Sequence, residues 1–391
     1  MPLLLVLAVA AAGEDSLVVR GYERFYNLDY TQAESDFSAY AASHPDDPSA
    51  YNHIAHSILY RDLFRAGALE TEMVTGNNPF LRRAKVSAPP SDRLAFDQNV
   101  DRAIALAQAR LKRNPQDAAA YYSLGVSYGL RANSDFLIRK AWTDALHDAS
   151  AARRAHARVT EIDPGFIDAR MVQGLYDYVV GSLPLHWRAL GWLTGYRGSR
   201  EQGIRTIEYV ASHGQVNRVD AEFLLCAIYR RERKPQLAVP LVRNLLQRFP
   251  ENYLLRMELA QMYSDMQQPE RALAVLERLR SLKLASAPGF TTLPLERICF
   301  AEGNVQFWYN DLDAALVNMQ RAAAAANNLD LNTGVLAWMR LGQIYDLRGE
   351  RRRASEAYSR AIGFAPDSDA AKESRLYLDA PYRRGGRRGS T

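Results

Sequence analysis

Apolar and small residues recur along the carboxyl-terminal third of the chain with the spacing of a helix pair. The positions that carry this pattern are Trp338, Leu341, Gly342, Tyr345, Gly349, Ala354, Tyr358, Ala361 and Pro366. Large apolar residues three or four apart line one face of a helix, and the small Gly342 and Ala354 are expected where two antiparallel helices cross. Pro366 ends the second helix because proline has no amide hydrogen to donate. The pattern therefore predicts two antiparallel helices in about 34 residues.

This spacing resembles the tetratricopeptide repeat (TPR), a helix–turn–helix unit that recurs along a chain. Weaker copies occur upstream: Gly21, Ala33, Phe37 and Pro45; Tyr121, Leu124, Gly125 and Tyr128; Leu225, Cys226, Tyr229 and Ala238; Leu259, Ala260, Tyr263, Ala272 and Leu276; Gly303 and Ala315. Each pair buries its apolar face only against its neighbours, so the pairs are expected to stack. We predict an all-α, TPR-type α-α superhelical solenoid of about eight helix pairs over residues 16–378, with 369–378 as a C-terminal capping helix.

Three segments do not fit the repeat and are predicted to be insertions, at about 65–91, 131–150 and 182–203. The first contains Gly76, Pro79, Pro89 and Pro90 and is too long for a simple turn, so it is either a lid or a mobile excursion. The second is expected to extend a helix pair beyond the stack.

Composition excludes several classes of protein. With 48% hydrophobic and 24% charged residues among 391, the chain is neither disordered nor collagen-like nor a multi-span membrane protein. The net charge is +5, and four arginines with one aspartate in residues 379–391 account for more than half of it. The body is therefore nearly neutral and nucleic acid is not the expected partner. Residues 379–391 are predicted to form a basic, disordered tail.

The amino end resembles a secretory signal. Residues 1–12 read as an apolar run that ends in Ala10-Ala11-Ala12, an A-x-A cleavage pattern. We predict a signal peptide at 1–12 and export to the periplasm or envelope of a bacterium; the alternative is a buried or frayed amino-terminal helix of a cytoplasmic protein. Cys226 and Cys299 are predicted to be buried thiols without a disulfide, which fits either redox compartment.

The third insertion carries its own signals for helix ends. Pro184 suits the first turn of a short helix over 185–194, and Gly195 suits the residue that closes it. Ser199 and Gln202 have the spacing of a capping box for the next helix, in which Gly203 would permit close packing against a neighbour.

Eleven positions in and before this insertion resemble the tetratricopeptide repeat protein 39 family, which includes the fungal inclusion body clearance proteins. They are Gly174, Ser182, Leu183, Pro184, Gly195, Tyr196, Gly198, Arg200, Glu201, Gly203 and Ile204. Ser199 departs from the acidic residue expected before the arginine. The resemblance implies a non-enzymatic helical scaffold with links to aggregate clearance and lipid handling, and it supplies no catalytic residue.

The sequence contains no recognisable catalytic or cofactor motif. A Walker loop, a Rossmann glycine fingerprint, a G-x-S-x-G elbow and an H-E-x-x-H helix are all missing. His53 and His56, three apart on one helix, could share a metal ion, but the sequence offers no third ligand. We therefore predict no enzyme, no cofactor and no metal site.

The first repeats concentrate aromatic and imidazole side chains. If Tyr51, Ile54 and Ala55 occupy the buried crossing positions, their neighbours face the concave side of the stack. The predicted peptide-binding groove consists of Tyr22, Tyr26, Asn52, His53, His56, Tyr60 and Tyr122. The alternative is ordinary packing of the first repeat against the second.

Five pairs of positions correspond to the groove positions at which TPR domains place a cationic carboxylate clamp: Asn52 and His56; Tyr122 and Val126; Phe223 and Ala227; Met257 and Gln261; Met339 and Gln343. None holds lysine or arginine, so an apolar or aromatic segment is the expected ligand. We predict a scaffold or adaptor that holds a protein segment in this groove, with 65–91 closing over it. The alternative is a protein that acts at a lipid or envelope surface through the apolar 185–193 helix and the basic tail.

Overall fold

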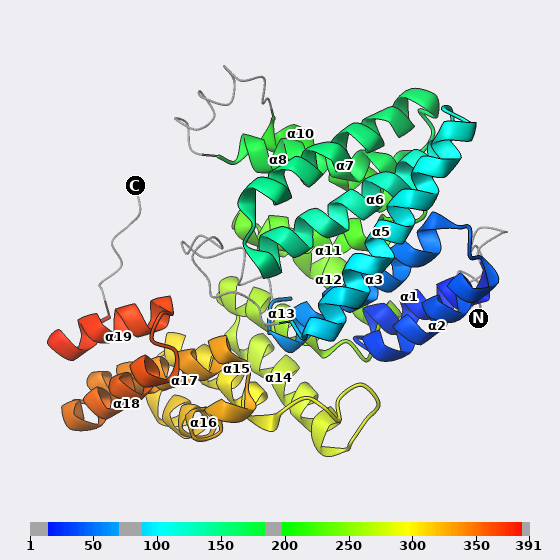
Figure 1. The fold of residues 1–391 in the computed structure, drawn as a ribbon. Coiled ribbons are helices and arrows are strands. Elements are labelled where there is room, and N and C mark those ends of the chain that lie inside the picture. Colours follow the sequence, from blue (N-terminus) through cyan, green and yellow to red (C-terminus); the bar gives the residue numbers. More distant parts are fainter. Residues whose placement is uncertain (1–14, 70–87, 184–197, 385–391) are drawn as a thin grey trace, which may run out of the picture. The chain divides into compact units, whose positions relative to one another are not determined.

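The structure, a computed structural model, is helical throughout the residues that it describes, which are 15–69, 88–183 and 198–384. These ranges contain 17 α-helices and no strand, and consecutive helices pack as antiparallel pairs (Figure 1). The prediction of an all-α, TPR-type solenoid is confirmed. The chain divides into two compact units, unit 1 with Met1–Leu63 and Lys85–Glu232 and unit 2 with Phe64–Ala84 and Arg233–Thr391.

Unit 1 holds the first repeats. Its helices are α1 Ser16–Tyr26, α2 Tyr30–Ser43, α3 Pro48–Arg65, α5 Pro90–Arg113, α6 Ala118–Ser134, α7 Trp142–Ile162, α8 Arg170–Gly181, α10 Arg200–His213 and α11 Arg218–Arg231. The last turn of α3 crosses into unit 2. The packed pairs include α1 with α2, α6 with α7, and α8 with α10.

Unit 2 holds the remaining repeats and the carboxyl-terminal cap. Its helices are α12 Pro235–Arg248, α13 Tyr253–Asp265, α14 Pro269–Leu284, α15 Leu295–Trp308, α16 Leu312–Ala324, α17 Leu331–Leu347, α18 Arg351–Phe364 and α19 Asp369–Asp379. The helix α19 buries Ala370, Ala371 and Ser374 and packs on α17 and α18, as predicted for a capping helix.

One turn recurs between the two helices of a pair. Leu28, Gln267, Asn310 and Gly349 each adopt a left-handed backbone with φ between 59° and 78°. Each is followed by a residue whose N–H donates back to a carbonyl in the last turn of the preceding helix, as Glu350 donates to Tyr345 at 2.8 Å. This bond satisfies a carbonyl that the helix end leaves free. Only Gly349 takes this conformation without strain, so tertiary packing overrides local preference at the other three.

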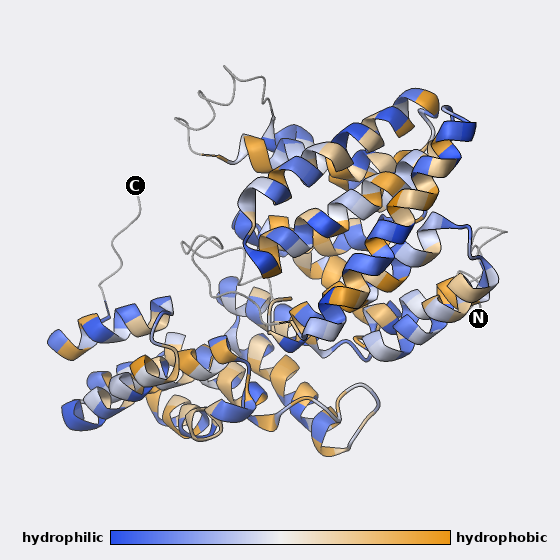
Figure 2. Ribbon diagram, in the orientation of Figure 1, coloured by the Kyte–Doolittle hydropathy of each residue, from blue (hydrophilic) through white to orange (hydrophobic). Residues whose placement is uncertain are grey.

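Close contact within a pair depends on glycine at the crossing. An added Cβ would lie 2.4 Å from the Phe37 ring at Gly21 and 2.5 Å from the Tyr358 ring at Gly342. Both rings are fully buried. Each glycine precedes its aromatic partner by sixteen residues in the sequence, so this spacing directly encodes the contact between the two helices. Figure 2 shows hydrophobic and hydrophilic residues side by side along each helix, as expected when one face is buried and another is in water.

The predicted insertion at 131–150 is formed by two helix ends. Helix α6 continues into a π-helical turn at Asp135–Arg139, Lys140 takes a left-handed conformation with φ of 58°, and α7 begins at Trp142. Trp142 packs edge-on against Phe136, with ring centroids 4.8 Å apart. Residues 131–150 thus comprise the end of α6, the π-helical turn and the first part of α7.

The start of the predicted tail is packed, which corrects the prediction of disorder from residue 379. Asp379 ends α19, and the N–H of Tyr382 donates to Asp346 Oδ2 at 2.8 Å. The Tyr382 ring packs against Tyr377 and Phe307, and the Arg384 guanidinium lies 5.0 Å from the Phe307 ring centroid. The prediction is wrong for 379–384 because Tyr382 and Arg384 find an aromatic surface within unit 2. Residues 385–391 lie outside the described residues.

Several sequence predictions fall wholly or largely outside the described residues. They concern the signal peptide at 1–12, most of the 65–91 insertion, and the short helix over 185–194 with Pro184, Gly195 and Tyr196. In the described part of the chain, none of the helices is both long enough and apolar enough to cross a membrane. Cys226 and Cys299 are buried thiols that form no disulfide, as predicted.

Candidate functional site

Five of the seven predicted groove residues lie together in unit 1. Tyr22 and Tyr26 of α1 stack with ring centroids 5.9 Å apart, and His56 and Tyr60 of α3 meet edge to face at 4.6 Å. The hydroxyl of Tyr22 lies 2.7 Å from Nδ1 of His53, and Phe25 packs against both His56 and Tyr60. We call Tyr22, Phe25, Tyr26, His53, His56 and Tyr60 the aromatic cluster. All but Phe25 and Tyr26 are partly exposed.

A helix far along the sequence completes this arrangement. The Tyr26 hydroxyl donates to Asp220 Oδ1 of α11 at 2.8 Å, and the Tyr26 ring stacks on Phe223 with centroids 5.8 Å apart. Tyr26 and Asp220 are 194 residues apart. Phe223 is one of the groove positions that the repeat phase predicts, and Asp220 lies one helical turn before it. The contact joins the first helix of unit 1 to its last described helix.

The other two predicted groove residues lie elsewhere. Asn52 is 3% exposed and sits between α3 and α6, where its Nδ2 donates to the Ser123 carbonyl and its Oδ1 accepts from Ser127. Its side chain is occupied within the fold, and we leave it out of the site proposed below. Tyr122 packs against His156 and Phe166.

Burial keeps the imidazoles of the cluster neutral. It lowers the pKa of His53 to about 4 and that of His56 to about 3. Burial also raises the pKa of Asp220 to about 6, while the bond from Tyr26 acts in the opposite direction. Near pH 7 the Asp220 carboxylate is therefore ionised, while the two imidazoles of the cluster are uncharged.

The position of Asp220 depends on a buried carboxylate before α11. Asp168 accepts hydrogen bonds from the backbone N–H groups of Gln215 and Asn217, at distances of 2.7 to 3.2 Å. These bonds hold the segment that leads into α11. The spacing of three residues on one helix would have placed Asp220 beside Phe223 on the same face. An acidic residue in the first turn of a helix is, however, ordinarily explained by its favourable interaction with the helix dipole.

The described residues of the stretch that resembles the tetratricopeptide repeat protein 39 family form the contact between α8 and α10. A Cβ on Gly203 would lie 2.4 Å from the Tyr178 nitrogen, so the backbones of the two helices touch there. Ser199 caps α10 by accepting from the Gln202 N–H, and Arg200 forms an ion pair with Glu232 at 3.2 Å. Glu232 also accepts from Tyr178. Gly174 and Gly198 are likewise close to neighbouring atoms, Ser182 follows the end of α8, and Glu201 is exposed.

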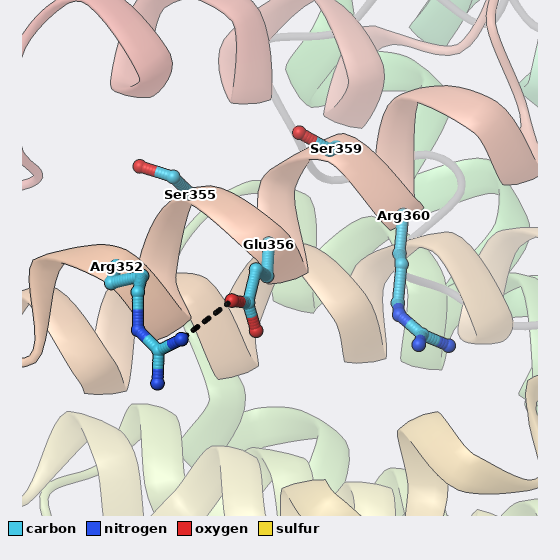
Figure 3. A pocket seen from close by; sticks show the side chains of 5 residues that line it. All are labelled: Arg352, Ser355, Glu356, Ser359 and Arg360. Atoms are coloured by element: carbon cyan, nitrogen blue, oxygen red, sulfur yellow. Dashed lines mark ion pairs between the residues drawn. The ribbon is translucent and has the colours of Figure 1, made fainter.

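Two surface hollows of unit 2 are weaker candidates. One lies along α18, where Ser355 and Ser359 point away from Arg352, Glu356 and Arg360 (Figure 3). Arg352 and Glu356 form an ion pair at 3.9 Å on this exposed face. The other lies at the ends of α13 and α15, beside Gln261, Trp308 and Asn310. Neither combines buried polar groups with aromatic walls. Across the described ranges, no three His, Cys, Asp or Glu side chains are placed to hold a metal ion.

Comparisons with known proteins identify the repeat. Models of the tetratricopeptide repeat match residues 92–129, 229–285 and 335–368. A search of curated proteins gave no match to this chain. The narrower resemblance to the tetratricopeptide repeat protein 39 family is not tested by these matches and stays a prediction.

Solved structures with a similar fold have low sequence identity to this chain. The crystal structure of the APC/C hetero-tetramer Cut9–Hcn1 has 13% identity and a TM-score of 0.50 over 93% of this chain and 55% of that chain. The human IFIT1 dimer with m7Gppp-AAAA has 14% identity and a TM-score of 0.45, covering 93% of this chain and 79% of that one. Yeast Tom70 has 11% identity and a TM-score of 0.41, covering 93% and 94%.

This chain thus spans about half the length of the Cut9–Hcn1 chain that it matches, and the likeness concerns the fold alone. The repeat models match in both units, and the helices around them pack as repeat pairs. The chain is therefore a tetratricopeptide repeat protein.

Proposed function

We propose that this chain is a non-enzymatic scaffold that holds a segment of a protein partner against the aromatic cluster of unit 1. Stacked helical repeats present extended surfaces for binding, and tetratricopeptide repeat proteins are generally scaffolds without catalytic activity. The observation that carries the proposal is the continuous contact among Tyr22, Tyr26, His53, His56 and Tyr60, four of which are partly exposed. Aromatic rings give large contact area at low entropic cost, which suits a peptide-binding surface.

Peptide selection tests this proposal directly. Short random peptides displayed on phage are selected on the full chain, and the affinity of the selected peptides is then measured for His56→Ala and Tyr60→Ala. We expect each substitution to weaken binding by about tenfold or more, because truncating a central aromatic contact costs about 2 kcal/mol. Circular dichroism checks that the helices are retained.

The matched control is Trp308→Ala, which removes an aromatic side chain of unit 2 that is 56% exposed. It should leave the affinity for the selected peptides unchanged. If no peptide is selected, or if all three variants bind equally well, the aromatic cluster is not the binding surface.

Export remains a separate hypothesis. It rests on residues 1–12, and amino-terminal sequencing of the protein from a native envelope fraction tests it: a mature chain that begins near residue 13 supports export. The lipid-surface alternative rests on residues 185–193, and liposome flotation tests it, because the scaffold proposal expects no flotation.

A further inference from the structure

Six of the seven described carboxylates that are less than 9% exposed are compensated in one of two ways. Five that are less than 9% exposed pair with arginine: Asp36 with Arg20 and Arg24, Asp135 with Arg139, Asp148 with Arg131, Glu222 with Arg218, and Glu302 with Arg280. Asp168 instead accepts backbone N–H groups. A charge removed from water needs such compensation, because its lost hydration is otherwise not replaced.

Asp220 differs from these carboxylates. It is partly buried, and its carboxylate accepts one hydrogen bond, from the neutral hydroxyl of Tyr26. Among the residues that the structure describes, no lysine or arginine forms an ion pair with it. The bond from Tyr26 occupies Oδ1, and none of the described residues donates to Oδ2.

The surroundings of Asp220 are aromatic. Phe223 lies one turn further along α11, and Tyr26 stacks on it. Burial raises the pKa of Tyr26 and Tyr60, and the negative charge of Asp220 raises both pKa values further. The pKa of Tyr122 is raised mainly by burial, then by Asp168 and Tyr22, and to a smaller extent by Asp220. The Asp220 carboxylate thus contacts the phenol of Tyr26 and acts through its charge on those of Tyr60 and Tyr122. Aromatic faces attract cations through their quadrupole, and a single carboxylate adds a full negative charge.

We propose that Asp220 and the aromatic rings around it bind the ammonium group of a lysine side chain carried by the partner segment. The inference rests on the proposed function, since the partner is the segment held against the aromatic cluster, and it adds the chemistry of one contact. The ammonium donates to Asp220 Oδ2 and lies among the rings of Tyr26, Tyr60 and Phe223.

The free oxygen favours lysine over arginine. A guanidinium binds a carboxylate best through two parallel bonds, which require both oxygens. Tyr26 already occupies one of them. The ammonium of lysine is a compact charge with three donors and needs only one carboxylate oxygen. It can therefore bind Asp220 through Oδ2 alone.

A small-molecule titration tests the cation site without a peptide. The full chain with isotope-labelled tyrosine rings is titrated with butylammonium chloride at constant ionic strength, and the ring resonances are followed by NMR. We expect saturable shifts for the wild type and at least tenfold weaker binding for Asp220→Asn, which keeps an acceptor for Tyr26 but removes the charge. The control is Glu23→Gln, an exposed carboxylate on α1, which should bind butylammonium as the wild type does.

Two further probes test which chemistry is recognised. 1-Butanol has the same chain without the charge and should give no saturable shift. Butylguanidinium should bind more weakly than butylammonium; equal or tighter binding would overturn the assignment to lysine. Equal binding of butylammonium to the wild type and Asp220→Asn would overturn the whole proposal.

The selected peptides separate this inference from the proposed function. Peptides that bind the wild type should contain a lysine whose replacement by the uncharged norleucine weakens binding at least tenfold. The same replacement should change affinity for Asp220→Asn less than twofold. Selected peptides that need His56 and Tyr60 but no lysine would support the proposed function and overturn the lysine site. Selection of no peptide overturns the proposed function, while butylammonium binding that depends on Asp220 still supports a cation site.

Discussion

Each unit of this protein contains a tyrosine hydroxyl that donates to an aspartate, and the two pairs differ in what else the aspartate receives. In unit 2, Asp346 accepts from Tyr358 at 2.9 Å, from Arg351 at 3.0 and 3.2 Å, and from the N–H of Tyr382 at 2.8 Å. In unit 1, Asp220 accepts from Tyr26 alone. The first carboxylate is neutralised by the chain itself and the second is not.

The difference separates a structural carboxylate from one that is available to a partner. Arg351 also donates to the carbonyls of Tyr377 and Leu378, so the charge pair in unit 2 fastens α19 to α18. Asp220 fastens α11 to α1 only through a neutral donor. A charge left without a counter-ion destabilises the free protein, and proteins retain such groups chiefly where function requires them.

The largest effect is expected from removing the counter-ion in unit 2. Arg351→Met leaves Asp346, whose side chain is 1% exposed, with neutral donors only. We expect the free energy of opening of α17 and α18, measured by native-state hydrogen exchange, to fall by about 3 kcal/mol. The neighbouring Arg352→Met is the control, because its ion pair with Glu356 is almost fully in water. Equal effects of the two substitutions would mean that Arg351 is not a structural counter-ion.

A smaller effect of opposite sign is expected in unit 1. A pKa raised from 3.8 to about 6 corresponds to roughly 3 kcal/mol of unfavourable free energy in the ionised form. Asp220→Asn removes the charge and keeps a polar group to bury, so we expect the free energy of opening of α1 and α11 to rise by about 2 kcal/mol near pH 7.5. Glu23→Gln should leave it unchanged. A loss of stability in Asp220→Asn would show that the carboxylate has a counter-ion in solution.

The difference in stability between the wild type and Asp220→Asn is expected to depend on pH. The folded state binds the Asp220 proton more tightly than the unfolded state, so the penalty is complete above about pH 6 and is relieved as the pH falls toward 3.8. The advantage of Asp220→Asn should therefore shrink between pH 7.5 and pH 4.5. His53 and His56 act oppositely, because their lowered pKa values remove stability as the pH falls below 6.5, but they act equally in both proteins.

The smallest effect is expected from the hydroxyl that joins α1 to α11. Tyr26→Phe keeps the ring against Phe223 and removes the donor to Asp220. We expect the free energy of opening of α1 to fall by about 1.5 kcal/mol in the wild type and by less in Asp220→Asn, since a hydrogen bond to a charged group is worth more. Tyr209→Phe, at a ring that is 41% exposed, is the control and should have no effect. An equal loss in both backgrounds would show that the charge is not part of the contact.

Sequence reasoning predicted best where partners lie within one repeat. Gly342 and Tyr358 are sixteen residues apart, and the helix period alone brings them together. It also predicted that Tyr22, His53 and His56 share one surface of the first repeats, and the structure brings their rings into contact. It could not show that Asn52 is covered by α6, because periodicity gives the face of a residue but not the depth to which a neighbour buries it.

Contacts between distant repeats were beyond sequence reasoning for a different reason. Tyr26 meets Asp220 only because small rotations accumulate over the helices between them, and no local pattern encodes their sum. The packing of Tyr382 on Phe307 was missed similarly, since a short polar segment gives no signal of the surface on which it folds.

The sequence by itself determined the helical repeat, because each pair depends on a few small and apolar residues at short, regular intervals. Tertiary structure alone decided which charges are compensated. Compensation depends on how helix packing spaces the side chains: the turn between α17 and α18 brings Arg351 to Asp346, whereas packing of α1 on α11 brings only the neutral Tyr26 hydroxyl to Asp220.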